Sequence, residues 1–162
     1  MTVSEMLSEL RRRGYDVDGA LVAITERPEI GETEVVKAKY KRKAGTANKY
    51  NDGTFVIKLA SKLWLTPGNA WDTIYNTFLH ELAHIFTQFT VDIRSHGQVW
   101  KNWCVIFGIE PEQYHPYEHL RRKKKFVVAV CVDCTHEYFG RRRLDRNATY
   151  RCTKCGGGIE KL

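Results

Sequence analysis

The sequence predicts an α+β protein in which helices pack on a small, mostly antiparallel sheet, followed by a small β unit. Two observations predict this fold: apolar residues recur at helical spacing on both sides of a strand-rich stretch, and closely spaced cysteine pairs occur after residue 130. A length of 162 residues, of which 43% are hydrophobic, fits one globular domain of about 100–150 residues with an appendage. We therefore expect one domain over residues 1–120 and a second unit over residues 121–162.

The first predicted element is an amphipathic helix that ends near residue 13. Its apolar residues recur at three- and four-residue spacing: Val3, Met6, Leu7 and Leu10. Ser4 can cap its start, and Gly14 follows its basic last turn. The segments after this helix have strand-like patterns: Ala20 to Thr25, Glu34 to Lys43 and Thr54 to Leu59. Turn-forming residues separate these segments: Pro28, Gly31, Gly45 and Asn51-Asp52-Gly53.

Two further helices are predicted in the second half of the domain. From Ala70 to about Phe89 the apolar residues keep helical spacing, with Asn69 as the N-cap. Gln98 to Phe107 reads as the next helix, which closes at Gly108. A polar and aromatic connector, Glu110 to Leu120, then leads to the second unit.

The first of these two helices carries the pattern His80-Glu81-Leu82-Ala83-His84. Residues i and i+4 lie one turn apart on the same face of a helix, so both imidazoles can bind one metal ion. Glu81 neighbours that face and can take a proton from a metal-bound water, as in zinc hydrolases. The alternative is a solvated helix that carries two histidines and a glutamate by chance. The apolar residues around the motif favour a zinc metallopeptidase.

A catalytic zinc ion requires a third protein ligand and one open position. His96 follows His84 by twelve residues and stands at the start of the next predicted helix, so a helix–loop–helix turn can return it to the metal. Asp92 is the competing third ligand, and a free imidazole is the alternative role for His96. We interpret Thr54 to Leu59 as an edge strand that can hold an extended peptide beside the metal.

The cysteines of the C-terminal unit stand in two pairs separated by seventeen residues: Cys131/Cys134 and Cys152/Cys155. This spacing predicts a zinc ribbon in which four thiolates hold one structural zinc ion. Disulfides are the alternative, but the first residues lack the basic and apolar regions of a signal peptide. We expect His136 to be a hairpin residue rather than a ligand. Cys104 lies in an apolar helical stretch and is expected to be a small buried hydrophobe.

The net charge of +7 is unevenly distributed along the chain. Residues 1–120 contain 14 Lys/Arg and 15 Asp/Glu, whereas residues 121–162 contain 12 Lys/Arg and four Asp/Glu. The basic character is therefore assigned to the C-terminal unit. The longest apolar runs are far shorter than the roughly 18 residues that a membrane span requires. We expect a soluble, cytoplasmic protein without a membrane partner.

Two basic clusters in the C-terminal unit predict contacts with nucleic acid. Their members are Arg121, Arg122, Lys123, Lys124, Lys125, Arg141, Arg142, Arg143 and Arg146. Such clusters can neutralise several phosphates without reading sequence. The alternative is a solvated basic face. Tyr138 and Phe139 can stack on bases, but we expect them in the small core of the ribbon.

The sequence resembles the SprT family, whose eukaryotic relatives include the Spartan proteases. The resemblance extends over nearly the whole chain. It is carried by four motifs: Ile57-Lys58-Leu59, Thr77 to His84, His96-Gly97-Gln98-Val99-Trp100-Lys101-Asn102-Trp103, and Tyr150-Arg151-Cys152-Thr153-Lys154-Cys155-Gly156-Gly157. It implies a minimal zincin-like metalloprotease domain followed by a zinc ribbon.

By position, the resemblance makes His80, His84 and His96 the ligands of a catalytic zinc ion and Glu81 the general base. It also implies cleavage of proteins associated with DNA or crosslinked to it, as in DNA–protein crosslink repair. The segment Tyr114-His115-Pro116-Tyr117-Glu118 resembles a His-containing stretch after the third ligand in some relatives. An approach of His115 or Tyr117 to the active site is one alternative, and packing of this connector on the helix is the expected role.

Two other functions remain open at this point. One is a nucleic-acid-binding or regulatory protein whose first metal is structural or whose peptidase site is inactive. The other is a zinc peptidase with a dedicated protein target and no role on DNA. We expect a monomer that holds two zinc ions, one catalytic and one structural.

Overall fold

The computed structural model describes the chain except for residues 66–67, 69, 94 and 114–124. It divides into two compact units, Met1–Leu120 and Arg121–Leu162. Several predictions fall on residues outside the described part: the N-cap role of Asn69, the roles of His115 and Tyr117, and the basic residues Arg121, Arg122, Lys123 and Lys124.

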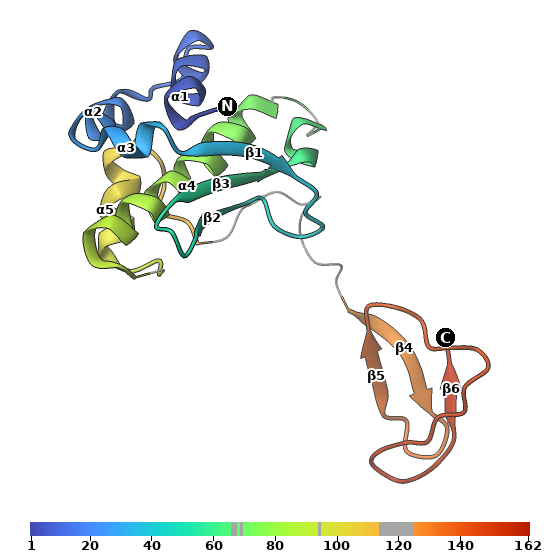
Figure 1. Ribbon diagram of the computed structural model, residues 1–162. Helices are drawn as coiled ribbons and strands as arrows, with labels where there is room; N and C mark the ends of the chain where they lie inside the picture. Colours follow the sequence, from blue (N-terminus) through green and yellow to red (C-terminus); the bar gives the residue numbers. More distant parts are fainter. Residues whose placement is uncertain (66–67, 69, 94, 114–124) are drawn as a thin grey trace. The chain divides into compact units, whose positions relative to one another are not determined.

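The first unit is a mixed sheet with helices packed on one face (Figure 1). Its elements in chain order are α1 (Val3–Arg12), α2 (Asp18–Glu26), α3 (Pro28–Gly31), β1 (Glu34–Ala38), β2 (Gly45–Lys49), β3 (Phe55–Ala60), the 3-10 helix η1 (Ser61–Leu65), α4 (Ala70–Val91) and α5 (Gln98–Ile106). The α+β class is confirmed.

The sheet differs from the prediction in pairing and in strand order. The strands lie in the order β1-β3-β2, with β1 parallel to β3 and β2 antiparallel to β3. The sheet is therefore mixed rather than mostly antiparallel. The segment Thr54 to Leu59, predicted as an edge strand, forms the central strand β3, because β1 pairs with its far side. Strand β2, which begins at the predicted breaker Gly45, lies at an edge instead.

Two local predictions near the N-terminus are wrong. Ala20 to Thr25 lies in helix α2 rather than in a strand, since a short apolar run fits either element until packing decides. Ala20 and Ala23 face the core from one side of that helix. The N-cap of α1 is Thr2, not Ser4, because Thr2 and Glu5 form a reciprocal capping box.

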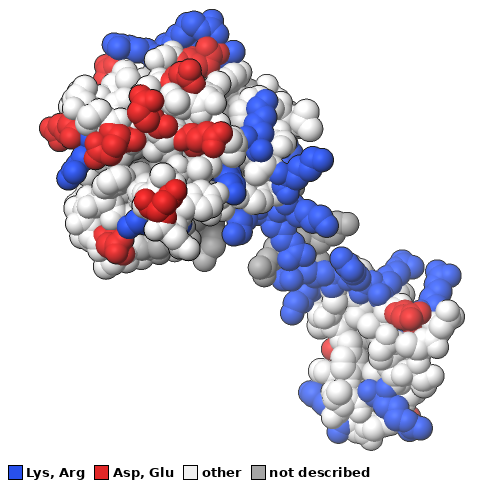
Figure 2. Space-filling view, in the orientation of Figure 1, with Lys and Arg blue, Asp and Glu red and all other residues white. Residues whose placement is uncertain are grey.

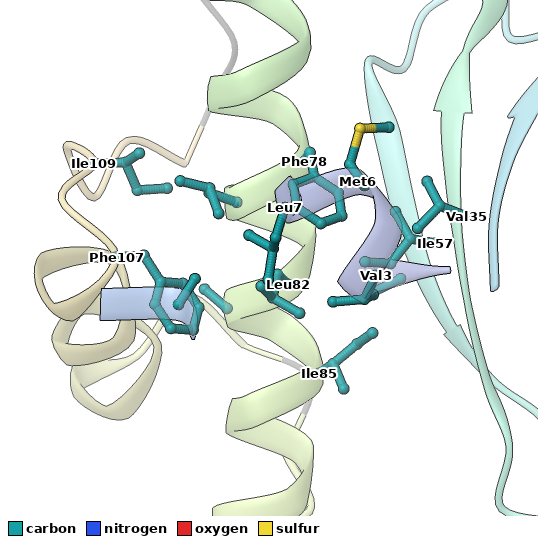
Figure 3. Close-up of a cluster of buried hydrophobic side chains, with 14 of the residues drawn as sticks. Val3, Met6, Leu7, Val35, Ile57, Phe78, Leu82, Ile85, Phe107 and Ile109 are labelled. Carbon is teal, nitrogen blue, oxygen red and sulfur yellow. The ribbon is translucent and has the colours of Figure 1, made fainter. Parts of the chain in front are cut away.

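The hydrophobic core lies between the sheet and helices α1 and α4 (Figure 3). Fully buried residues meet there from three elements: Leu7 of α1, Ile57 of β3, and Phe78 and Leu82 of α4. Burying side chains of this size contributes about 1.5–3 kcal/mol each relative to exposure. The core face of α4 therefore fixes the rotation of the helix about its axis and decides which residues face outward.

The second unit is a small antiparallel sheet. Strands β4 (Phe126–Cys131), β5 (Glu137–Gly140) and β6 (Ile159–Lys161) lie in the order β5-β4-β6. Among the described residues of this unit, the buried hydrophobic side chains are those of Val128, Ala129, Cys131 and Cys152. So small a core cannot by itself offset the conformational entropy of the 42 residues of this unit, as is typical of domains that fold around a metal.

Candidate metal centres

Helix α4 turns His80 and His84 to the same side, away from the core residues Phe78, Leu82 and Ile85. The four-residue spacing places the two imidazoles one above the other, with ring centroids 5.1 Å apart. His96, just before α5, completes the group. The Nε2 atom of His96 lies 3.1 Å from Nε2 of His84 and 3.4 Å from Nε2 of His80.

These distances match the donor set of a zinc ion. Nitrogen ligands at about 2.0–2.1 Å from a tetrahedral zinc ion lie about 3.4 Å from one another. The ligand atoms of all three histidines lie within 4.8 Å of each other. Burial lowers the pKa of His96, which favours the neutral imidazole that a metal requires. The three residues thus fit zinc with one coordination position left for water or substrate.

Asp92, the competing third ligand, lies elsewhere. Its carboxylate accepts a hydrogen bond from Lys49 Nζ at 2.8 Å, and its side chain is largely exposed. The residue follows Val91, the last residue of α4, and has a positive φ of 49°. The residue whose ring nitrogen approaches those of His80 and His84 is His96 rather than Asp92.

Trp100 packs against the rings of all three histidines. It lies one turn after His96 on α5 and is completely buried. Its ring centroid is 4.8 Å from that of His80, 5.4 Å from that of His84 and 4.5 Å from that of His96. Sequence reasoning placed Trp100 on an apolar helix face without assigning it to the site, although its four-residue spacing from His96 was a usable signal.

Glu81 is buried beside this group, with 7% of its surface exposed. It faces Gly45, the first residue of the edge strand β2. A Cβ added at Gly45 would lie 2.9 Å from Glu81 Cγ, 3.1 Å from Glu81 Oε1 and 3.0 Å from Thr77 Cγ2. The missing side chain of Gly45 therefore makes room for the carboxylate. The sequence indicated Gly45 only as a strand breaker.

A cleft of about 840 Å³ opens over Glu81 and the three histidines. Helix α4 forms its floor, and one wall consists of residues 42–48, which include most of β2. The segment after α5 also lines the cleft, with residues 108–110, 112 and 113. An edge strand thus borders the cleft as expected, but it is β2 and not the segment 54–59.

The four ribbon cysteines form a second group. Their Sγ atoms lie within 4.8 Å of one another, with Cys131 3.5 Å from Cys155 and Cys134 3.6 Å from Cys152. Sulfur ligands at about 2.3 Å from a tetrahedral zinc ion lie about 3.8 Å apart, so the thiols fit one zinc ion. None of the described cysteines forms a disulfide.

Backbone and tyrosine donors surround these sulfurs. The amides of Cys134, Lys154 and Gly157 point at cysteine Sγ atoms at 3.4–3.5 Å. Tyr138 donates a hydrogen bond from its hydroxyl to Cys152 Sγ at 3.1 Å and lowers the pKa of that thiol to about 5. Donors of this kind stabilise the thiolate that a metal requires.

The remaining predicted residues of the ribbon are distributed as follows. The ring of His136 contacts Tyr138. Phe139 is 56% exposed, so its expected place in the core is wrong, because alternate residues of β5 face outward. The described members of the two predicted basic clusters are all exposed: Lys125, Arg141, Arg142, Arg143 and Arg146.

In the first unit, Cys104 is fully buried and its pKa is raised to about 12 by burial, as expected of an inert thiol. No helix in the described part of the chain is long and apolar enough to span a membrane.

An HExxH helix, a third histidine returned to it, a buried glutamate and an edge strand along the cleft define a zinc-dependent, protease-like domain. The family model described as the SprT-like family matches residues 22–115. The chain therefore belongs to the SprT-like family. The matched segment includes all three histidines and Glu81, and it ends before the ribbon. A search of curated proteins found no match.

Proposed function

We propose that this protein is a zinc endopeptidase that cleaves proteins bound or crosslinked to DNA. The observation that carries the peptidase part is the buried carboxylate of Glu81, which lies next to three converging histidines and opens into a cleft bordered by an edge strand. The histidines His80, His84 and His96 would hold the catalytic zinc ion. When bound, zinc lowers the pKa of water and polarises a carbonyl.

The chain's own residues supply the other parts of the reaction. Glu81 accepts the proton of the attacking water and delivers it to the leaving amine. Helix α4 and the space left by Gly45 hold the carboxylate in place for both transfers. The open side of β2 can bind an extended substrate by backbone hydrogen bonds, which recognise the peptide chain irrespective of its sequence.

The DNA part of the proposal is supported by the ribbon. Four exposed arginines follow β5 or lie in the next loop, in a unit that contains 12 Lys/Arg and four Asp/Glu. Lys161 Nζ donates hydrogen bonds to the backbone oxygens of Asp145 and Arg146, which ties that loop to β6. Arginines presented by a tied loop suit contacts with phosphates.

The test compares the wild type with Glu81→Gln on a disordered DNA-binding protein, with and without DNA. Glu81→Gln should retain zinc at the wild-type stoichiometry and lose cleavage, because an amide cannot accept the proton. Glu110→Gln, the same chemical change at the exposed wall of the cleft, is the matched control and should remain active.

Three results would contradict parts of the proposal. Unchanged cleavage by Glu81→Gln would eliminate the assigned base. A wild-type protein that binds DNA but cleaves nothing would instead be a nucleic-acid-binding or regulatory protein. Loss of DNA affinity in Arg141→Ala/Arg142→Ala/Arg143→Ala without loss of cleavage on DNA would indicate a peptidase with a dedicated protein target.

A further inference from the structure

The charges of the first unit are segregated, although they nearly cancel in total. Residues 35–71 contain eight Lys/Arg and one Asp/Glu, whereas the rest of residues 1–120 contain six Lys/Arg and fourteen Asp/Glu. Figure 2 shows most acidic residues of this unit on the side of α2 and α3, and basic residues in two places: at the top, over α1, and on the side of the β1–β2 connection. The near-neutral total hides a strongly basic surface.

This surface is held in a fixed shape by η1. Lys62 Nζ donates a hydrogen bond to the backbone oxygen of Lys41 at 2.7 Å, and Ser61 Oγ donates one to the backbone oxygen of Ala38 at 3.1 Å. Lys37 Nζ lies 4.3 Å from the centre of the Trp64 ring. These contacts hold the β1–β2 connection, residues 39–44, against the helical turn, so its lysines are displayed from an anchored loop.

Most of these lysines have no acidic neighbour. Within the described residues, no carboxylate lies within 4.0 Å of the ammonium groups of Lys37, Lys39, Lys41, Lys43, Lys58 or Lys62. Uncompensated cations at close spacing repel one another and raise the local potential by several kT. An anionic partner would relieve this repulsion, and its affinity would depend strongly on salt.

The basic surface reaches the catalytic cleft. Arg42 and Lys43 line the cleft together with β2, and Glu110 and Glu112 line it from the segment after α5. The two segments that line the cleft thus carry opposite charge. A polyanion that approached the cleft would be attracted to the β2 side and repelled from the other, which fixes the side on which it lies.

The outer face of the sheet extends the same surface. Lys58 occupies the middle of β3, opposite Thr46 of β2. Its ammonium group lies 5.9 Å from the ring centre of Tyr50, which is 45% exposed. Hydroxyl groups and an aromatic ring among lysines are typical of surfaces that bind a nucleic-acid backbone. Regularly spaced phosphates can engage many lysines at once, whereas an acidic peptide would need several carboxylates in a fixed order.

We propose that this basic surface, formed by residues 37–43 with Lys58 and Lys62, binds the phosphate backbone of nucleic acid next to the cleft. The catalytic unit then contacts nucleic acid directly, independently of the ribbon. The inference deepens the proposed function and rests on it only for the nature of the substrate. The nucleic acid would then lie on the β2 side of the cleft, next to the substrate protein that is being cleaved.

The experiment uses the full-length, zinc-loaded chain with Glu81→Gln, so that proteolysis cannot interfere. Arg141→Ala/Arg142→Ala/Arg143→Ala is added to reduce binding by the ribbon. In this background, Lys39→Ala/Lys41→Ala/Lys43→Ala is compared with Arg11→Ala/Arg27→Ala/Lys101→Ala, which removes the same charge elsewhere on the first unit. The affinity for a fluorescent DNA duplex is measured between 50 and 300 mM salt. Over this range of about sixfold, the slope of log K against log salt reports the number of phosphate contacts.

The slope of log K, the association constant, against log salt is negative, and Lys39→Ala/Lys41→Ala/Lys43→Ala should make it less steep. The expected reduction is about two to three, since each phosphate contact contributes about 0.9. The control variant should leave the slope unchanged. Equal slopes for the two variants would overturn the inference, and so would an unchanged slope for the lysine variant. The same three lysine changes are also made in the enzyme that keeps Glu81. If they slow the cleavage of an acidic protein there and leave the DNA affinity unchanged, the surface recognises the protein substrate instead. Zinc content and Tm verify folding.

Discussion

Gly45 of β2 lies directly against the side chain of Glu81 on α4: a Cβ at position 45 would approach Glu81 Cγ to 2.9 Å and Oε1 to 3.1 Å. Cβ contacts below 3.0 Å are essentially never seen and one at 3.1 Å is unusually tight, so the side chain of Glu81 would have to shift. The three histidines that would hold zinc belong to α4 and to the turn before α5, not to β2. The edge strand therefore contacts the proposed general base without supplying a candidate metal ligand.

Gly45→Ala should consequently lower kcat while the affinity of the catalytic site for zinc is preserved. A displacement of about 1 Å in a reacting group can reduce the rate about 10²-fold. The measurement is kcat and KM on a protein substrate together with zinc content. Because the added methyl group also meets Thr77, Thr77→Ser in the same chain distinguishes the two contacts. Full recovery by that second change would mean that Thr77, rather than Glu81, is disturbed.

Trp100→Ala should weaken zinc binding at the histidines and destabilise the first unit. Truncating a buried Trp costs about 3–5 kcal/mol, and losing a group that orients metal ligands typically reduces metal affinity about 10–100-fold. Trp103→Ala is the matched control, since Trp103 packs on Phe86 and Phe107 of the same region. It should lower Tm with little effect on zinc affinity. Equal losses of zinc affinity in both variants would assign the effect to general destabilisation.

Cys152→Ser should disorder the ribbon and leave the first unit folded. The ribbon's few buried side chains cannot replace the metal as the source of its stability. All four tryptophans lie in the first 120 residues, so tryptophan fluorescence reports on the first unit alone. Trypsin should cut rapidly at Arg141 to Arg143 in this variant. Cys104→Ala is the control and should retain zinc at the wild-type stoichiometry. A ribbon that resists trypsin after Cys152→Ser would show that its zinc ion is dispensable.

In the zinc-free protein, the first unit should lose stability as the pH falls through about 6.5, the ordinary pKa of histidine. Burial lowers the pKa of His96 in the folded state, so the unfolded chain takes up a proton that the folded chain does not, and acid favours unfolding. The Tm from tryptophan fluorescence is measured between pH 7.5 and 5.5, within the range where histidine titrates. His96→Gln should flatten this dependence, and an identical slope in that variant would exclude His96 as the source.

Local sequence patterns predicted helices α1, α4 and α5 and the two groups of candidate metal ligands, but not α2, α3 or the strand order. Helix α4 has long apolar periodicity, and the four-residue spacing of His80 and His84 defines a common face on any helix. The three-residue spacing within each cysteine pair similarly implies that both thiols of a pair lie in one tight turn. Strands carry no comparable information about their neighbours, so the parallel pairing of β1 with β3 and the edge position of β2 were not predictable. The short segment Ala20 to Thr25 became helical because its alanines pack in the core.

Spacing within one helical turn or one short loop was enough to predict His80, His84 and the cysteine pairs as metal ligands and Glu81 as the base. Features that depend on contacts between distant segments followed only from the folded chain. It returned His96 rather than Asp92 to the helix, packed Trp100 behind the histidines and set Gly45 against Glu81. It also gathered the lysines of residues 37–43 beside the cleft, because a net charge summed along the chain does not show on which face the charges meet.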